Sequence, residues 1–319
     1  MVDYHRVLKA ACIIFNMIMY TLLLVMNYAA NNKSGILFGN KSVSQVIRKY
    51  SIEFSPAPYA FEIWKLVNAW TAAWILYTLS YIFRKRMPDA LSPFFFVCFT
   101  LATVSNMAWT QFISWEMIKV TSGFVFAMVV FLYASLACSF AGLYKQRYFI
   151  GRFDYWVIHM LVNNGIVVYA TWVTVAALRS LALILTYFHG IERELSVTIA
   201  LGILMLLIVV WFILENTIFR EDLLYTITIY PVLIWIFVAS IILNLNRVSR
   251  LNTAIMQSLL AVSCTLFIGK ISLVVWKIIN KCRDTRAKAD LAMMEITPGS
   301  DENREQKYTD RSENQELVD

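Results

Sequence analysis

Eight long apolar stretches constrain the fold of this chain more than any other feature of its sequence. A helix needs about 20 apolar residues to cross the ~30 Å hydrocarbon core of a bilayer, because each residue rises ~1.5 Å. Stretches of this length cover residues 7–28, 59–83, 92–113, 119–143, 155–177, 195–218, 224–245 and 255–279. Backbone groups in lipid must pair within their own segment, which requires helices. The sequence therefore predicts an all-α, polytopic membrane helix bundle with about eight transmembrane helices in contact with the lipid bilayer.

Composition supports a membrane protein and excludes several soluble classes. The 319 residues are 59% hydrophobic and 15% charged, whereas soluble domains carry about 25% charged residues. A nucleic-acid-binding domain, a secreted disulfide scaffold and a cytosolic enzyme are therefore poor fits. The net charge of +7 is unevenly divided, because the segment from Asp284 onward holds 10 acidic and 5 basic residues. We expect residues 284–319 to form a disordered cytoplasmic tail, since so polar a segment cannot bury enough apolar surface to fold.

Basic residues in the short connections predict the orientation. Eight crossings place the main basic clusters on one face, and the positive-inside rule makes that face cytoplasmic, with both termini on it. The clusters are Arg6 and Lys9, residues 84–86, Lys145 with Arg147 and Arg152, and Lys277 with Lys281, Arg283, Arg286 and Lys288. The connection 219–223 is acidic although it is assigned to the same face. An arrangement with seven crossings, in which one of the last three segments lies at the interface, therefore stays open.

The connection after the first span carries two glycosylation sequons, at Asn32 and Asn40. Both fall on the face assigned to the outside, so they favour the plasma membrane or another membrane of the secretory pathway. The first span, followed by Ala29 and Ala30, also has features of a cleaved signal peptide, but its apolar run is long for that role. Residues 178–194 are too polar to cross, and we expect them to lie along the outer surface.

Aromatic and amide side chains lie together on the faces of three predicted spans. Ionisable and amide groups in a span are costly and normally face protein or a watery cavity. Helical spacing groups them as Trp64 with Asn68, Asn106 with Trp109, and His159 with Asn163, with Trp172 further along the last span. As a set, these seven residues predict an aromatic-walled cavity in which a few amides orient a hydrophobic small-molecule ligand.

Helix contact is the alternative interpretation of the same residues. Asn and His often hydrogen-bond between transmembrane helices, for roughly 0.6–2 kcal/mol each. This interpretation is favoured for each residue taken singly, and the cavity only for the set. The fourth span carries small residues every four positions, at Ala134, Cys138 and Gly142. That spacing allows close helix approach, and it predicts a purely structural span.

Nothing in the sequence predicts catalysis. The chain has three histidines, and none has metal-ligand spacing to acids or cysteines. There is no phosphate-binding glycine-rich loop and no nucleophile elbow. We therefore expect a protein that is not an enzyme, with no metal and no cofactor.

Two other functional classes stay open on the sequence. A secondary transporter or channel would use polar steps such as Glu62, Lys65, His159 and Glu215, although there is no inverted repeat of broken helices. A seven-span receptor with an extra crossing is a weaker alternative, because the Asp-Arg-Tyr and Asn-Pro-x-x-Tyr motifs are missing. A homo-oligomer is a candidate assembly for any of these classes.

Three short segments carry a family resemblance. Residues 54–64 (Phe-Ser-Pro-Ala-Pro-Tyr-Ala-Phe-Glu-Ile-Trp) form a rigid Pro-x-Pro start to a helix, followed by aromatic residues at the membrane boundary. This segment resembles the start of the second helix in the tryptophan-rich sensory protein / translocator protein family, the peripheral benzodiazepine receptors. Residues 106–112 (Asn-Met-Ala-Trp-Thr-Gln-Phe) and 170–176 (Ala-Thr-Trp-Val-Thr-Val-Ala) resemble the third- and fifth-helix motifs of that family.

The resemblance implies a five-helix unit with a pocket that opens toward the first loop. Family members bind tetrapyrroles, sterols and related hydrophobic molecules, and they have been linked to the sensing, transport or degradation of these molecules. The resemblance therefore implies a bound porphyrin or sterol as ligand. The implied pocket residues in this chain are Trp64, Asn68, Asn106, Trp109 and Trp172. Two departures from the pattern are a first loop without tryptophan and Glu62 in place of a small residue. The implied organisation is a translocator-like unit at 1–180, three additional helices at 181–283 and the tail at 284–319.

Overall fold

The structure is a computed structural model that describes residues 4–31, 43–50, 52–84, 87–217, 223–244 and 249–296. Every regular element in these ranges is a helix, which confirms the all-α fold. The chain divides into two compact units, Met1–Ile268 and Gly269–Asp319. Helical residues of the second unit continue to Ile296. The predicted glycosylation sites Asn32 and Asn40, and residues 297–319 of the predicted tail, lie outside the described residues. The first part of that tail, residues 284–296, is helical and not disordered as predicted, because it continues α10 without a break.

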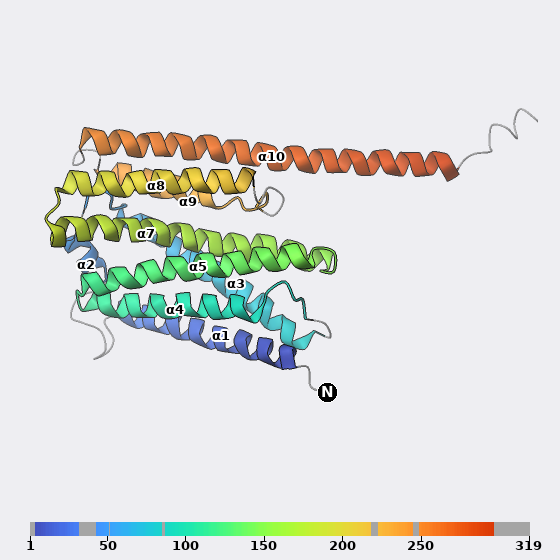
Figure 1. Ribbon diagram of the computed structural model, residues 1–319, viewed down its shortest axis with the longest axis horizontal. Coiled ribbons are helices and arrows are strands. Elements are labelled where there is room, and N and C mark those ends of the chain that lie inside the picture. Colours follow the sequence, from blue (N-terminus) through green and yellow to red (C-terminus); the bar gives the residue numbers. More distant parts are fainter. Residues whose placement is uncertain are drawn as a thin grey trace, which may run out of the picture. The chain divides into compact units, whose positions relative to one another are not determined.

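The elements follow one another as a series of long helices with short helical turns between them (Figure 1). In chain order they are α1 (Tyr4–Asn31), α2 (Val43–Lys49), the 3₁₀ turn η1 (Pro58–Glu62), α3 (Ile63–Phe83), α4 (Pro93–Ser114), α5 (Ile118–Gln146), α6 (Arg152–Val157), the π-helical turn η2 (Ile158–Asn163), α7 (Asn164–His189), α8 (Arg193–Asn216), α9 (Ile229–Asn244) and α10 (Arg250–Ile296).

Among the described residues, seven helices are long and apolar enough to cross a membrane. The seventh predicted span, 224–245, differs from expectation because α9 has only 16 residues. At ~1.5 Å per residue that length covers roughly 24 Å, less than the ~30 Å hydrocarbon core. Its start is delayed because Asn164 binds the preceding chain: the Ile227 amide donates to Asn164 Oδ1 at 3.0 Å, and the Thr228 hydroxyl donates to the Asn164 carbonyl at 3.1 Å.

The segment expected along the outer surface, 178–194, is instead mostly a continuation of the fifth span. Residues Arg152–His189 form one 38-residue helical run. Leu178, Ala182 and Leu183 are buried, so the apolar face of the helix extends beyond Arg179. The run ends at Gly190, whose φ of 68° is the left-handed conformation that commonly terminates helices. The prediction was wrong there because the charged residues of this segment lower its mean hydropathy, although its apolar residues continue the buried face of the helix.

Helix α7 lies at the centre of the first unit. It packs against α3, α5, α8 and α9, while α4 packs between α1 and α5. In the most apolar part of the α6–α7 run 78% of residues are buried, against at most 56% in the other spans. Side chains on every face of α7 therefore meet a neighbouring helix, so this helix can bring residues from several spans together.

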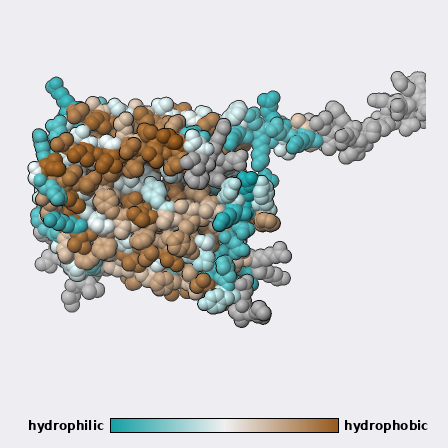
Figure 2. Space-filling view, in the orientation of Figure 1, coloured by the Kyte–Doolittle hydropathy of each residue, from teal (hydrophilic) through white to brown (hydrophobic). Residues whose placement is uncertain are grey.

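Small residues permit the closest contacts of this packing. A Cβ atom built on Gly142 of α5 would lie 1.8 Å from the carbonyl oxygen of Ala90, in the turn before α4. One built on Gly165 of α7 would lie 2.8 Å from Cδ1 of Trp70. The close approach predicted at Gly142 is thus confirmed. The prediction of a purely structural span was wrong, because Thr121, Ser122 and Val125 of the same helix line the cavity described below. Figure 2 shows apolar residues over the middle of the bundle and hydrophilic residues at its two ends, as a bilayer requires.

Helix α9 fixes the Pro-x-Pro segment that begins the second span. The Ala57 amide donates to the carbonyl of Ala239 at 3.2 Å, and the Trp235 indole donates to the carbonyl of Ala60 at 3.1 Å. Asn244 donates to the carbonyl of Ser55 at 3.1 Å. These bonds satisfy backbone groups that proline and the tight turn leave unpaired.

Candidate functional site

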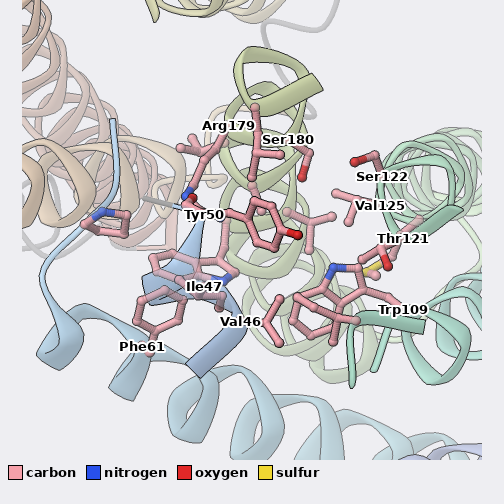
Figure 3. A pocket seen from close by; sticks show the side chains of 18 of the residues that line it. Val46, Ile47, Tyr50, Phe61, Trp109, Thr121, Ser122, Val125, Arg179 and Ser180 are labelled. Atoms are coloured by element: carbon pink, nitrogen blue, oxygen red, sulfur yellow. Dashed lines mark hydrogen bonds between the residues drawn. The ribbon is translucent and has the colours of Figure 1, made fainter. Parts of the chain in front are cut away.

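A cavity of about 90 Å³ lies between α7 and five other helices, α2, α3, α4, α5 and α9. Including its open mouth, the empty space is about 930 Å³. Figure 3 shows Arg179 of α7, Trp109 of α4, Thr121 of α5 and Ile47 of α2 around this space. The lining residues are Val46, Ile47, Tyr50, Phe54, Pro56, Phe61, Trp64, Asn106, Trp109, Ile113, Ile118, Thr121, Ser122, Val125, Met128, Trp172, Val173, Val175, Ala176, Arg179, Ser180, Leu183 and Ile236.

Aromatic pairs hold the walls of the cavity rigid. The rings of Phe61 and Trp172 meet edge to face with centroids 5.7 Å apart, and those of Trp64 and Tyr169 at 5.6 Å. Such geometry stabilises each pair by about 0.5–1.5 kcal/mol beyond the stabilisation that comes from burying the rings. The two pairs connect the start of the second span to the middle of α7. The indoles of the second and fifth spans therefore face the same space with restricted mobility.

Most of the polar side chains at the cavity are already hydrogen-bonded within the protein. Asn106 donates through Nδ2 to the hydroxyl of Tyr169 at 2.6 Å, which ties α4 to α7. The hydroxyls of Thr121 and Ser122 each donate to a carbonyl of their own helix at 2.9 Å. The remaining polar group of note is Arg179, which stands on the face of α7 toward α2.

Helix α2, in the connection between the first two spans, forms one wall of the cavity. Val46 is buried against Ile113, Ile118 and Leu183, so the short helix is seated on apolar residues of three spans. Its end is fixed by an ion pair of 2.6 Å between Lys49 Nζ and Glu116 Oε2. The cavity thus lies beside the first loop, as the family resemblance implies.

Glu116 adopts an unusual backbone conformation in the turn between α4 and α5. Its φ is 56°, the only positive value at a non-glycine residue in the described part of the chain. This conformation costs a non-glycine residue of order 1 kcal/mol and persists when surrounding contacts fix it. The ion pair with Lys49 is one such contact. The backbone conformation of Glu116 and this ion pair therefore both help to determine the position of α2.

The seven predicted ligand residues separate into two groups. Trp64, Asn106, Trp109 and Trp172 line the cavity together. Asn68, His159 and Asn163 do not line it. Asn68 lies one turn beyond Trp64, where its carbonyl accepts a hydrogen bond of 2.9 Å from the hydroxyl of Tyr20 on α1.

His159 and Asn163 lie in the π-helical turn η2, nearer the other end of α7. His159 is fully buried among aromatic rings, with the ring centroid of Tyr155 at 4.6 Å and that of Tyr225 at 6.1 Å. Asn163 accepts a hydrogen bond of 2.6 Å from Ser139 on α5. These contacts are of the helix-to-helix kind that the sequence left open as the alternative.

Sequence reasoning missed Arg179, Tyr50 and the residues of α2. Arg179 was placed in a surface segment because the residues around 180–194 are polar. The available signal was the helical spacing of Trp172, Ala176 and Arg179, which puts all three on one face of α7. The position of Tyr50 depends on how the first loop folds back, and no periodicity encodes that.

The polar steps proposed for a transporter have separate surroundings. Glu62 and Lys65 form an ion pair with each other, and both side chains are exposed. Glu215 is buried and accepts a hydrogen bond of 2.8 Å from the hydroxyl of Tyr230. His159 belongs to the aromatic cluster around η2. Within the described ranges, no group of three or more His, Cys, Asp or Glu side chains is placed to hold a metal ion.

An all-α bundle with seven long apolar helices defines an integral, multi-pass membrane protein. The sequence profile of the family described as TSPO-like protein matches residues 13–275. The chain therefore belongs to the TSPO-like protein family, which confirms the resemblance seen in its motifs. The matched range continues past residue 180, through α8 and α9 and into α10. No characterised protein and no solved structure matches the chain in the other two comparisons.

Proposed function

We propose that this protein binds a hydrophobic, tetrapyrrole- or sterol-like molecule in the cavity beside α2, in order to sense or transport it, and that it is not an enzyme. The observation that carries the proposal is the convergence of Trp64, Trp109 and Trp172 from three spans on one cavity. Ligand sites are typically concave and mostly apolar, with a few placed polar groups. Flat aromatic walls favour a planar or ring-shaped apolar body.

Tryptophan quenching tests the proposal directly. The protein in phosphatidylcholine nanodiscs is titrated with protoporphyrin IX, and we expect saturable quenching of its indole fluorescence. The Trp109→Ala variant should weaken the affinity by about tenfold or more, since truncating a buried aromatic anchor typically costs 2 kcal/mol or more. Trp276→Ala is the matched control, because Trp276 is exposed and does not line the cavity.

Two results would contradict the proposal. One is quenching that rises linearly without saturation, which indicates partition into lipid. The other is an equal loss of affinity in Trp109→Ala and Trp276→Ala. Cholesterol serves as a competitor, and displacement of the porphyrin by cholesterol extends the ligand class to sterols.

We also propose that both termini are cytoplasmic and that the protein resides in a membrane of the secretory pathway. The support is the distribution of basic residues together with the sequons at Asn32 and Asn40. The test is the gel shift on deglycosylation of the expressed protein, compared with Asn32→Gln and Asn40→Gln. A protein that carries no glycan in cells would remove the support from the sequons, and cysteine accessibility on Cys282 would then decide the orientation.

A further inference from the structure

Arg179 is the only side chain with a full charge among the residues that line the cavity in the described part of the chain. Its Nε donates to the hydroxyl of Ser55 at 3.2 Å, and its Nη2 donates to the carbonyl of Tyr50 at 3.3 Å. Both acceptors are neutral. A guanidinium has five N–H donors and stays protonated. Two weak bonds to neutral oxygens leave its charge and most of its donors uncompensated.

Three other cations of this unit illustrate how a charge is compensated by a carboxylate. Lys49 pairs with Glu116 at 2.6 Å, and Arg84 with Asp154 at 2.5 Å. Lys9, which is buried, has Asp89 at 3.6 Å. No carboxylate of the described residues lies within ion-pair distance of Arg179. A partly buried charge in an apolar environment is costly unless an opposite charge accompanies it, so the position is best explained by an anion from outside the chain.

Two tryptophans at the cavity add N–H donors to the guanidinium. The indole N–H groups of Trp109 and Trp172 have no hydrogen-bond partner in the ranges that the structure describes, and an indole can only donate. The hydroxyls of Thr121 and Ser122 already donate to backbone carbonyls, so toward a ligand they can only accept. The cavity therefore offers unused N–H donors and a positive charge within apolar walls.

We propose that the cavity selects an amphiphilic anion, with its carboxylate or similar anionic group at Arg179 and its apolar body against the indoles of Trp109 and Trp172. This inference rests on the proposed function and specifies the ligand class. A guanidinium binds a carboxylate through two parallel hydrogen bonds, which adds geometric selectivity to the charge. A neutral sterol alcohol would leave the charge of Arg179 uncompensated and should bind more weakly.

An anionic head group on an apolar body has two sources in a cell. One is a diffusible carboxylic acid, and the other is an anionic phospholipid of the surrounding membrane. Both present the same chemistry to Arg179, so they are separated by competition. The probe pair is protoporphyrin IX and its dimethyl ester, which share the ring and differ in charge. Cholesteryl hemisuccinate and cholesterol form a second pair with a different body.

The experiment measures quenching by each porphyrin in phosphatidylcholine nanodiscs, with the sterols as competitors. For the wild-type protein we expect the acid of each pair to bind about 10–100-fold more tightly than its neutral partner, the range for a hydrogen bond to a charged group. Arg179→Gln should remove that preference while the ester binds as before. Arg179→Lys should keep part of it. Arg193→Gln is the matched control, since Arg193 is exposed and does not line the cavity.

The outcomes separate this inference from the proposed function. Saturable, Trp109-dependent binding with equal affinities for acid and ester overturns the role of Arg179 and leaves ligand binding intact. An equal loss for both probes in Arg179→Gln also overturns it, since Arg179 then only holds Tyr50 and Ser55. Absence of Trp109-dependent binding by any probe removes the proposed function itself. If Arg179→Gln does not fold, the test uses the ratio of acid to ester affinity in the wild-type protein and in Arg179→Lys. Equal affinities for acid and ester in the wild-type protein then overturn the inference, and a preference for the acid that Arg179→Lys reduces supports it.

Phosphatidic acid added to the nanodiscs identifies the source of the anion. Displacement of the acidic porphyrin that depends on Arg179 supports the inference with a membrane lipid as occupant. An acid preference that persists unchanged in its presence supports the inference with a diffusible acid.

Discussion

The two ends of α7 carry similar sequence signals and use them differently. Near its start, His159 and Asn163 lie in the π-helical turn and are packed against α5 and the chain before α9. About 13 residues later, roughly 20 Å along the helix, Trp172 begins a face that lines an open cavity. Aromatic and amide residues are thus closely packed between helices at one end of α7, and they line a cavity at the other end.

The difference comes from what faces each end of the helix. At the packed end, Gly142 admits the backbone of Ala90 and Gly165 admits the indole of Trp70, so little space remains. The side chain of Asn164 makes four hydrogen bonds there, among them one of 2.8 Å from its Nδ2 to the His159 carbonyl, which also accepts from the Asn164 backbone amide of the π turn. At the cavity end, α2 closes the space from the loop side with side chains alone. A cavity persists at the end of α7 where one of the walls is a short helix and not a full span.

The largest expected effect is the loss of close packing in Gly142→Ala. The new Cβ would meet the Ala90 carbonyl at 1.8 Å, so one of two backbones must move. We expect destabilisation of about 2–3 kcal/mol, as for overpacking of a dense interior, measured by unfolding in detergent. The control is Gly123→Ala in the same helix, where nothing lies within 4 Å of the new methyl. It should stabilise by about 0.5–1 kcal/mol through helix propensity. Equal effects at the two positions would contradict the packed arrangement.

Adjacent residues of α7 provide the sharpest test of where the hollow lies. Ala176 lines the cavity, whereas Ala177 is buried in the core. Ala176→Leu should leave unfolding within about 0.5 kcal/mol of wild type. It should weaken porphyrin binding by roughly tenfold or more, because the added methyl groups occupy the ligand's space. Ala177→Leu should do the reverse, with a loss of about 1–3 kcal/mol in stability and unchanged affinity. Destabilisation by both substitutions would show that no usable cavity exists at Ala176.

The helices were predictable from sequence, because apolar runs of about 20 residues have few alternatives to spanning helices. The end of α7 was not predictable, because the sequence around Arg179 is typical of a surface segment. Only the packed structure shows that Ser55 and Tyr50, at the end of α2, face Arg179. The length of α9 depended on capture of the Ile227 amide by Asn164, a contact between residues 63 positions apart.

For the site, helical spacing identified four lining residues among seven candidates. Helical spacing could not show that Trp172 lines the cavity and His159 does not, because periodicity defines a face of a helix and not what lies opposite that face. The decisive information is the position of glycines and of loop residues such as Tyr50, which only the packed structure contains.

A smaller effect is expected at the ion pair that holds α2. Lys49→Gln should increase the dissociation rate of the porphyrin by a few-fold at most, since exposed ion pairs are screened by solvent and contribute little. The double exchange Lys49→Glu with Glu116→Lys should recover part of the loss. The hydrogen bond to Glu116 raises the pKa of Lys49 above its usual 10.5. As far as the lysine is concerned, the contribution of the pair is therefore present below pH 10.5 while Glu116 is ionised, and it is lost as the pH rises through the raised pKa of Lys49. A dissociation rate unchanged in Lys49→Gln would show that α2 does not restrict access.

The smallest effect is expected at the packed end, in His159→Phe. Neither ring nitrogen of His159 has a hydrogen-bond partner in the part of the chain that the structure describes, and its neighbours are aromatic rings. Phenylalanine has a similar shape without the buried polar atoms, so stability should stay the same or rise by about 1 kcal/mol. Porphyrin affinity should change by less than twofold, since the residue does not line the cavity.

Trp172→Ala is the matched test of the other end of α7, and it should weaken porphyrin binding about tenfold or more. A loss of 1–3 kcal/mol in His159→Phe would instead indicate a bound water or ligand on the imidazole. A loss of porphyrin affinity in that variant would join the two ends of α7 into one functional site and remove the distinction between them.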